Sequence, residues 1–385
     1  MKYYIIAGEA SGDLHGSNLI RQVILRDSDA QIRGWGGELM QQAGAEIVKN
    51  YRDLAFMGFT EVIRNLPAIL RNIKFCKSDI LAFRPDLIVF IDYPGFNLRI
   101  AEWARKNAFK TVYYISPQVW AWKESRVEGI RANIDKMLVI LPFEQAFFKK
   151  WNFETEYVGH PLVEVIDRFR QSPESKEFPT IYTAAGRQST INKPLIALLP
   201  GSRKQEILKK LPVMLQASLA FPAYQFVVAE APGQDSQFYD EILQEYPLAG
   251  RVRNQTYSLL LHAKAACVTS GTATLETALF AVPEVICYKG SSISYQIAKR
   301  LIKVKYISLV NLIMDKPVVK ELIQDEMNPE NIIVELKKLL TDGPSATQLR
   351  TDYEDLRSLL SKGGNASEQA AALIVNFLRK ANRVS

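Results

Sequence analysis

The sequence contains few of the residues that bind metals or form disulfides. Only three cysteines and three histidines occur among its 385 residues. The cysteines, Cys76, Cys267 and Cys287, are odd in number and include no CxxC pair, which argues against a disulfide framework or a zinc site. No DxD-type pair of carboxylates directly follows an expected strand either. We therefore expect a protein that needs neither a metal nor a cofactor.

Long apolar runs are also missing. No segment approaches the roughly 18 consecutive apolar residues of a membrane span, and Met1-Lys2 leads directly into strand-like residues without a signal-peptide pattern. These absences predict a cytoplasmic protein. The net charge of +7 favours phosphates or anionic lipid headgroups as partners. No nucleic acid is expected, because the basic residues are spread along the chain and form no recognition motif.

Short, apolar, β-branched runs alternate with helical patterns along most of the chain. Continuous apolar runs are typical of parallel strands that are covered on both faces. The alternation predicts an α/β fold with two Rossmann-like, doubly wound domains. The expected strands are 3–7, 87–92, 111–116 and 137–141 in the first half, and 195–199, 225–229, 265–269 and 284–288 in the second.

Composition also suggests where the domains begin and end. Residues 171–193 are rich in Ser, Thr, Pro and Gln, as expected of a linker between a domain at 1–170 and a second domain at 194–345. Residues 346–385 are expected to pack back across the domains as helices. Amphipathic patterns predict helices at about 329–341, 346–360 and 366–380.

Two motifs with chemical potential follow expected strands of the first half. In Gly8-Glu9-Ala10-Ser11-Gly12-Asp13 the glycines permit a tight turn, and a helix start favours an anionic or hydroxyl-rich group. The spacing differs from GxGxxG, which disfavours a hydride-transfer enzyme. Asp92 ends a buried strand, where partial burial would raise its pKa towards that of a general base. The alternatives are a plain turn with Asp13 near a cap, and Asp92 as the cap of the next helix.

A third motif in the first half is aromatic. Ser116-Pro117-Gln118-Val119-Trp120-Ala121-Trp122 follows an expected strand. The two tryptophans suit the protein core, which is the usual position of aromatic side chains. Pro117 and Gln118 beside them favour instead a shaped loop that lines an acyl or sugar pocket. Both interpretations stay open on the sequence alone.

Two turns in the second half are suited to phosphate. Leu198-Leu199-Pro200-Gly201-Ser202-Arg203 offers backbone N–H groups, a hydroxyl and a guanidinium. In the segment 270–276 (SGTATLE), the first three residues place donors at a helix start, and Glu276 can accept from ribose hydroxyls. The alternatives are a tight turn with a solvated arginine, and a glutamate that only favours the helix dipole. Together the turns predict a site for a nucleotide-sugar diphosphate.

In this combination and order, the motifs resemble those of the lipid-A-disaccharide synthase family. The likeness extends from residue 3 to about residue 375. It is carried by GEASGD at 8–13, SPQVWAW at 116–122, Phe143-Glu144, Gly159-His160-Pro161, LLPGSR at 198–203, SGTATLE at 270–276 and YISLVNL at 306–312. The resemblance implies a GT-B fold, with two Rossmann-like domains that face a cleft, and a metal-independent, inverting glycosyltransferase.

The resemblance also implies a reaction and a set of site residues. 2,3-Diacylglucosamine would pass from its UDP derivative to the 6-hydroxyl of 2,3-diacylglucosamine 1-phosphate (lipid X), giving a β-1,6-linked disaccharide 1-phosphate and UDP. Asp92 matches the position of the base, and Glu9 that of a second carboxylate. The UDP-sugar site would contain Gly201, Ser202, Arg203, Ser270, Gly271, Thr272, Glu276 and Asn311. The acceptor or acyl pocket would contain Ser11, Gly12, Gln118, Trp120 and Trp122.

Acylated substrates imply contact with a membrane. Apolar residues recur at helical spacing between 59 and 75, beside Arg64, Arg71 and Lys74, as in helices that lie in a membrane interface. The apolar positions are Phe59, Val62, Ile63, Leu66, Ile69, Leu70 and Ile73. We expect peripheral association with the inner face of the inner membrane, and the alternative is an ordinary helix that faces the core. The resemblance further suggests a homodimer with exchanged C-terminal segments.

Two other functions stay open from the sequence. One is another GT-B sugar-nucleotide enzyme, such as a UDP-N-acetylglucosamine epimerase or a peptidoglycan-type transferase, which would retain the 270–276 motif. The other is a non-catalytic protein that binds a UDP-sugar or a lipid. Such a protein would tolerate Asp92→Asn without loss, because it performs no chemistry.

Overall fold

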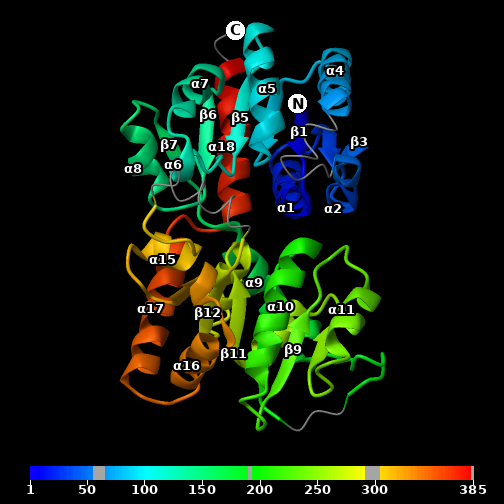
Figure 1. The fold of residues 1–385 in the computed structure, drawn as a ribbon. Coiled ribbons are helices and arrows are strands. Elements are labelled where there is room, and N and C mark those ends of the chain that lie inside the picture. Colours follow the sequence, from blue (N-terminus) through cyan, green and yellow to red (C-terminus); the bar gives the residue numbers. More distant parts are fainter. Residues whose placement is uncertain (55–65, 190–192, 291–303, 383–385) are drawn as a thin grey trace. The chain divides into compact units, whose positions relative to one another are not determined.

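The structure is a computed structural model that describes residues 1–54, 66–189, 193–290 and 304–382. Its contacts divide the chain into two compact units (Figure 1). The first unit comprises Met1–Pro161 together with Leu360–Ser385, and the second comprises Leu162–Leu359. None of the helices among the described residues combines the length and apolar content needed to cross a membrane.

The first unit is built on a parallel sheet. Its described residues form seven strands in the order β3-β2-β1-β4-β5-β6-β7. Every neighbouring pair is parallel. The strands are β1 (Lys2–Ala7), β2 (Gln31–Gly36), β3 (Glu46–Asn50), β4 (Leu87–Ile91), β5 (Thr111–Tyr114), β6 (Lys136–Val139) and β7 (Thr155–Tyr157).

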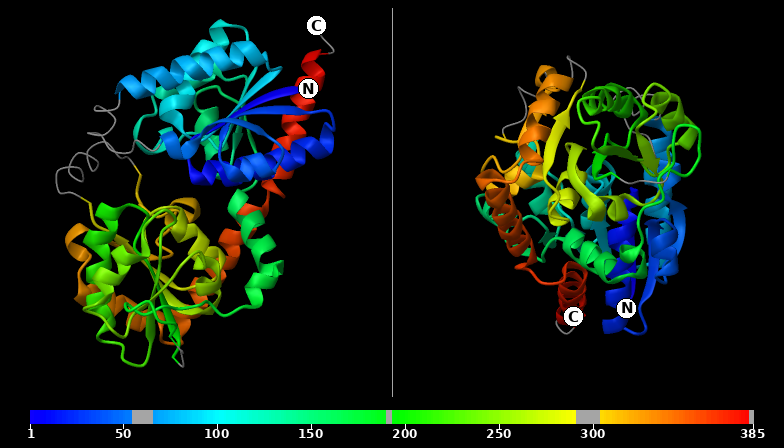
Figure 2. Two further views of the ribbon diagram at one scale, coloured as in Figure 1. Left: turned by 90° about the vertical axis from the view of Figure 1, so that its right-hand side faces the viewer. Right: turned by 90° about the horizontal axis from the view of Figure 1, so that it is seen from below.

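Helices cover both faces of this sheet (Figure 2, left). Side chains of α1 and α18 pack on one face, and those of α4, α5, α7 and α8 pack on the other. Because both faces are covered, all five residues of β4 are buried, as parallel strands require. The helices are α1 (Ala10–Arg26), α2 (Glu38–Gln42), α4 (Leu66–Phe83), α5 (Pro94–Lys106), α6 (Val119–Trp122), α7 (Arg126–Asn133), α8 (Glu144–Lys149) and α18 (Ala366–Asn382), with a 3-10 turn η1 (Tyr51–Leu54).

The second unit repeats this design. Where the structure describes it, six parallel strands follow the order β10-β9-β8-β11-β12-β13. They are β8 (Leu195–Leu199), β9 (Gln225–Ala229), β10 (Gly250–Val252), β11 (Ala263–Thr269), β12 (Glu284–Tyr288) and β13 (Lys320–Ile323). Side chains of α10, α11 and α16 form a core with one face of the sheet.

The remaining elements of the second unit connect and flank this sheet. The helices are α9 (Pro161–Gln171), α10 (Lys204–Ser218), α11 (Ser236–Leu243), α12 (Thr256–His262), α13 (Thr272–Leu279), α15 (Leu309–Met314), α16 (Pro329–Leu339) and α17 (Pro344–Ser361). Two 3-10 turns are η2 (Pro173–Lys176) and η3 (Gln324–Glu326). The expected C-terminal helices therefore occur as α16, α17 and α18.

The boundaries between the units differ from those expected. The polar segment 171–193 does not connect the units, because the chain already enters the second unit after Pro161. Tyr182 and Arg251 exchange two backbone hydrogen bonds of 2.9 Å each, which attach this segment to the edge strand β10. Its polar composition reflects a surface edge that is anchored by buried residues such as Pro179 and Ile181, of which Ile181 is 1% exposed. Residues 346–385 are also divided, with α17 in the second unit and α18 in the first.

Candidate active site

The first candidate site lies at the carboxyl ends of β1 and β4. These strands are paired, with Ala7 opposite Ile91, so the residues that follow them meet at the same sheet edge. Glu9 follows β1 and Asp92 follows β4. Their charges interact, since Glu9 is one of the groups that raise the pKa of Asp92. The structure therefore brings together the two carboxylates that the sequence predicts as catalytic.

The turn that carries Asp92 has an unusual backbone. Asp92 and Tyr93 have φ values of 46° and 50°, a left-handed conformation that costs a non-glycine residue free energy. The Asp92 carbonyl accepts hydrogen bonds from the Tyr113 hydroxyl at 2.5 Å and from the Asn97 side-chain amide at 2.7 Å. Gly8 supports the turn by its lack of a side chain, because a Cβ there would lie 2.3 Å from the Tyr93 ring.

Burial sets the protonation of Asp92. Removal from water and, as a smaller effect, the negative charge of Glu9 together raise the pKa of its carboxyl to about 6, while the Tyr93 N–H opposes both. A carboxylate with this pKa is mostly ionised at pH 7 and is more basic than an exposed aspartate. Asp92 can therefore act as a general base near neutral pH.

Of the other residues in the 8–13 motif, Asp13 and Gly12 are buried and support the local fold. The Asp13 carboxylate is buried and accepts from the backbone N–H groups of Gly37, Leu39 and Met40 at 2.7, 3.2 and 3.0 Å. It therefore caps α2, which agrees with the capping alternative although the helix is a different one. Gly12 is buried and packs beside Ala7, whereas Ser11 is exposed at the start of α1.

The aromatic motif forms a corner around a buried glutamate. Glu144 is 1% exposed. It accepts hydrogen bonds from the Ser116 hydroxyl and, at 3.1 Å, from the Trp120 indole N–H. Its other oxygen accepts from the backbone N–H groups of Ile140 and Leu141 at 3.2 and 2.9 Å. Burial raises the pKa of Glu144 to about 7.

This arrangement shows whether Trp120 lies in the core or lines a pocket. Trp120 is only 7% exposed, and its ring contacts Phe143 edge-on at a centroid distance of 4.9 Å. Trp120 is therefore part of the core at the ends of β5 and β6, while Gln118 is exposed. The side chain of Trp122 lies outside the described structure.

The second candidate site is a cavity of about 320 Å³ at the carboxyl ends of β8, β9 and β11. It brings together the two turns that the sequence predicts to bind phosphate. It is lined by Leu199, Gly201, Ser202, Glu206, Ala229, Glu230, Ala231, Pro232, Thr256, Thr269, Ser270, Gly271, Thr272, Ala273 and Glu276.

The walls of this cavity are suited to an anionic ligand with hydroxyl groups. The start of α13, with Gly271 as its N-cap, directs backbone N–H groups and the positive end of the helix dipole outward. The buried Thr269 hydroxyl lines the cavity without a hydrogen-bond partner among the described residues. Glu276 accepts from the Tyr257 hydroxyl at 2.7 Å, and burial raises its pKa. This carboxyl is in place to accept from a ligand hydroxyl.

A buried cation, the Lys210 ammonium of α10, lies next to the turn that follows β8. Sequence reasoning missed it. Gly201 has φ +109°, and a Cβ at this position would lie 2.9 Å from a Glu206 carboxylate oxygen. The same oxygen lies 3.7 Å from the Lys210 ammonium, whose side chain is only 3% exposed. Loss of solvation lowers the pKa of Lys210. A lysine on an amphipathic helix usually lies in solvent, so only the spacing of four residues from Glu206 hinted at this pair.

Not all expected UDP-sugar residues line the cavity. Arg203 lies outside its lining, with its side chain 63% exposed and 3.6 Å from Glu206. Asn311 is buried, and its amide bonds Val319 through both its oxygen and its nitrogen, and Glu321 through its nitrogen. Asn311 therefore joins α15 to β13 in this structure. Glu230, which lines the cavity and pairs with Arg251 at 2.5 Å, was not expected from the sequence.

Comparison with known proteins decides the family. A family model described as lipid-A-disaccharide synthetase matches residues 3–375. A lipid-A-disaccharide synthase from Syntrophus aciditrophicus is 38% identical over 384 residues, covering 98% of both chains. The chain belongs to the lipid-A-disaccharide synthase family. Its relatives include the synthases of Trichlorobacter lovleyi, 36% identical with 98% and 97% of the two chains covered, and of Coxiella burnetii, 35% identical with 97% and 98% covered.

Solved structures show the fold of this synthase family member. The glycotransferase of kitacinnamycin matches with a TM-score of 0.66 at 13% identity and covers 98% of this chain and 99% of its own. The UDP-GlcNAc 2-epimerase of Neisseria meningitidis matches with a TM-score of 0.63 at 10% identity, covering 99% and 100%. These likenesses confirm the predicted GT-B class with two Rossmann-like domains. The family match identifies a glycosyltransferase and favours the synthase over the epimerase and the non-catalytic alternatives.

The protonation of Asp92 can be measured directly. We expect its carboxyl to titrate with a midpoint near pH 6, because burial and Glu9 both disfavour the ionised form. Removal of the Glu9 charge in Glu9→Gln lowers this midpoint. The measurement is a pH titration of ¹³C-labelled aspartate carboxyls by NMR, with the Asp92 signal assigned through Asp92→Asn.

A matched control is Glu102→Gln. It removes an exposed carboxylate of the same unit, and this carboxylate pairs with Lys106. This control should leave the Asp92 midpoint unchanged. An Asp92 midpoint near 4 in the wild type, or one that does not respond to Glu9→Gln, contradicts the electrostatic description of the site.

Proposed function

We propose that this protein performs the inverting transfer of 2,3-diacylglucosamine from its UDP derivative to the 6-hydroxyl of lipid X. The products are the β-1,6-linked disaccharide 1-phosphate and UDP. The observation that carries the proposal is the Asp92 carboxyl, buried at a strand end with a pKa of about 6. A second observation supports the proposal: in the second unit, the two turns suited to phosphate line the same cavity.

Asp92 is the proposed general base. An inverting transfer needs a group that takes the proton of the acceptor hydroxyl while the oxygen attacks the anomeric carbon. A carboxylate with a pKa near 6 has the basicity for this step and is still mostly ionised at pH 7. Glu9 is the proposed positioning carboxylate, because its charge keeps the pKa of Asp92 high.

The second unit is proposed to hold UDP and to stabilise its charge as the sugar leaves. The N–H groups at the start of α13 and the Thr269 hydroxyl are the proposed donors to the diphosphate. The Lys210 ammonium adds a positive charge beneath the Gly201 turn, with Glu206 as its partner. Arg203, which is 63% exposed, would move onto the diphosphate when the ligand binds. Glu276 is the proposed acceptor from a ribose hydroxyl.

The assay of the proposed reaction combines UDP-2,3-diacylglucosamine and lipid X in mixed micelles with EDTA. We expect the wild type to release UDP and form the disaccharide, with kcat/KM falling below about pH 6 as Asp92 becomes protonated. Asp92→Asn should reduce kcat at least about 100-fold, as loss of a general base does, while UDP binding changes little. Asp86→Asn is the matched control, because its carboxylate bonds the Lys2 N–H, and Lys2 begins β1.

Each alternative outcome has a defined meaning. No disaccharide from the wild type despite UDP binding contradicts the transferase proposal. Turnover that Asp92→Asn leaves intact retains the reaction but moves the base elsewhere. Activity that is lost in EDTA and restored by a divalent cation contradicts the metal-independent mechanism.

We also propose that α4 lies on a membrane surface, from which acylated substrates would be taken. Its outward face carries Leu70, Phe75 and Leu81, which are 56%, 45% and 50% exposed. Arg71 and Lys74 lie exposed on the same face. Exposed apolar side chains interspersed with basic ones suit an anionic interface. The homodimer suggested by the resemblance stays a prediction.

This surface differs from the apolar pattern expected at 59–73. Residues 59–65 and the side chain of Leu66 lie outside the described structure. Ile73 is buried in the core with Cys76 and Ile80, and Ile69 packs against that core. Among the described positions of the expected pattern, only Leu70 is exposed. The proposed surface is therefore the face of α4 opposite to Ile69 and Ile73, and it continues to Leu81.

Binding to vesicles tests the proposed membrane surface. The double variant Leu70→Asp with Phe75→Asp should lower partitioning onto phosphatidylethanolamine–phosphatidylglycerol vesicles by about tenfold or more, because two large side chains lose their burial in lipid. Leu25→Asp is the control, since Leu25 lies on α1 and is 76% exposed. Co-sedimentation measures both variants. Equal partitioning of the double variant and the wild type contradicts the proposal.

A further inference from the structure

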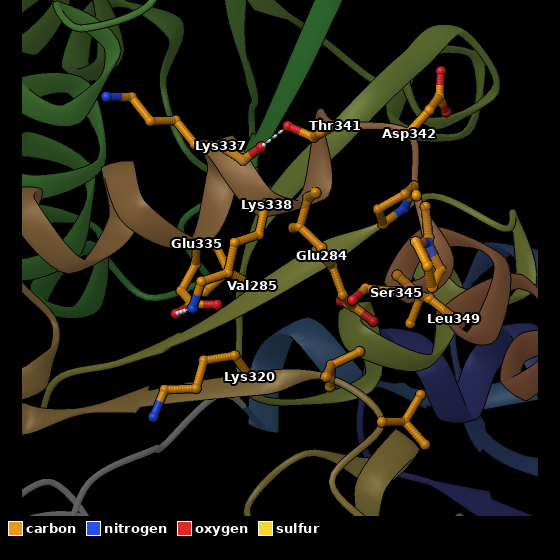
Figure 3. Close-up of a pocket in the computed structure, with 17 residues that line it drawn as sticks. Glu284, Val285, Lys320, Glu335, Lys337, Lys338, Thr341, Asp342, Ser345 and Leu349 are labelled. Carbon is orange, nitrogen blue, oxygen red and sulfur yellow. Dashed lines mark hydrogen bonds and ion pairs between the residues drawn. The ribbon is translucent and has the colours of Figure 1, made fainter.

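The second unit contains another cavity, which lies at the amino-terminal ends of strands, whereas the proposed nucleotide site lies at carboxyl ends. Glu284 opens β12 and lines this cavity, whereas the nucleotide cavity lies where strands end. The volume is about 680 Å³, large enough for a small organic molecule. Its walls come from β12, β13, α16 and the first turns of α17 (Figure 3). No residue lines both cavities.

Glu284 is the exceptional residue of this cavity. Its side chain is 1% exposed, and neither carboxyl oxygen meets hydrogen-bond geometry with a described residue, although the Tyr353 hydroxyl, which is buried in the same way, lies near enough to act on it. The side chain extends towards Ser345 and Leu349 (Figure 3). A buried carboxyl whose hydrogen bonds are not made in full is energetically costly. Such a group is expected where a ligand supplies the missing donors.

Four of the five other charged side chains that line the cavity have an ion-pair partner. Lys338 pairs with Glu335 at 2.8 Å. Lys320 pairs with Glu326 at 3.6 Å, and Asp342 lies 3.7 Å from Arg350. The Lys337 side chain points away from the Glu284 carboxyl (Figure 3). The remaining walls are mainly apolar and include Val285, Val318, Val319, Leu339, Pro344 and Leu349.

We infer that this cavity binds a small organic amine, whose ammonium group donates to Glu284 and whose apolar body fills the space between α16 and α17. An ammonium offers several donors and a charge opposite to that of a carboxylate, so the pair is a charge-assisted one. A metal ion is a poor match, because Glu284 is a single carboxylate among apolar side chains and calcium takes six or more oxygen ligands. The inference does not depend on the proposed transferase activity.

Protonation distinguishes an amine from a neutral ligand. Burial raises the pKa of Glu284 well above its usual value, and the nearby Tyr353 hydroxyl opposes this only in part. The empty cavity therefore favours the neutral acid, and formation of the ammonium–carboxylate pair releases a proton. The groups around Glu284 are Tyr353 of α17 with Asp352 beside it, Lys320 of β13, and Glu335 and Lys338 of α16.

The test uses cyclohexylmethylamine as the probe, with cyclohexylmethanol as its neutral counterpart and cyclohexanecarboxylate as its anionic one. Calorimetry in buffers of different ionisation enthalpy measures affinity and proton release. We expect the amine to bind more tightly than either counterpart, to release a proton and to bind more tightly at pH 8 than at pH 6.

Three variants locate the probe. Glu284→Gln keeps the shape of the side chain and should weaken amine binding about tenfold or more, as loss of a charged hydrogen bond does. Ala346→Phe fills the cavity without touching Glu284 and should also abolish binding. Glu335→Gln, at the rim, should leave it unchanged. Thermal unfolding of each variant checks that it folds.

Two outcomes overturn the inference. One is that the amine fails to bind the wild type, or binds no better than the alcohol or the carboxylate. The other is that Glu284→Gln, correctly folded, binds the amine as tightly as the wild type. Binding without proton release overturns the assigned pairing as well.

Discussion

The structure depends on one geometric constraint, the parallel pairing of strands within each sheet. Parallel strands direct all their carboxyl ends to one edge, so side chains distant in sequence meet there. Glu9 and Asp92 meet because β1 pairs with β4. The turns at Gly201 and Ser270 meet because β8 pairs with β11. The two candidate sites, one in each unit, follow from the same rule.

The carboxylate proposed as the base, that of Asp92, is held in an energetically costly state by its surroundings. Two consecutive left-handed residues cost about 1–3 kcal/mol each, and burial disfavours the charge of Asp92. Hydrogen bonds from Tyr113 and Asn97 to the Asp92 carbonyl offset part of this cost. In the aromatic corner, four donors converge on the buried Glu144 carboxyl and offset the cost of its burial in the same way.

Much of this could be predicted from the sequence, and the rest could not for physical reasons. The central strands were predictable, because β4 and β8 are apolar on both faces, and so were the motifs that follow them. The edge strands β3, β7, β10 and β13 were missed, since an edge strand is only partly covered and lacks a continuous apolar run. The inner strand β2 was missed as well, because its sequence QIRGWG has no such run. The direction in which individual side chains point could not be predicted either. Nothing in the sequence shows that Trp120 and Asn311 point inward, or that Lys210 and Glu284 are buried, because these depend on packing between distant elements.

The central claim is that the nucleotide binds at the strand ends of the second unit. Hydrogen–deuterium exchange with and without UDP, followed by mass spectrometry of peptides, tests this most directly. The account predicts that UDP slows exchange in peptides that cover residues 199–206 and 269–276, because these two segments contain lining residues of the cavity. Protection confined to 8–13 and 92–97, or to 341–349 beside Glu284, would place the nucleotide elsewhere and contradict the account.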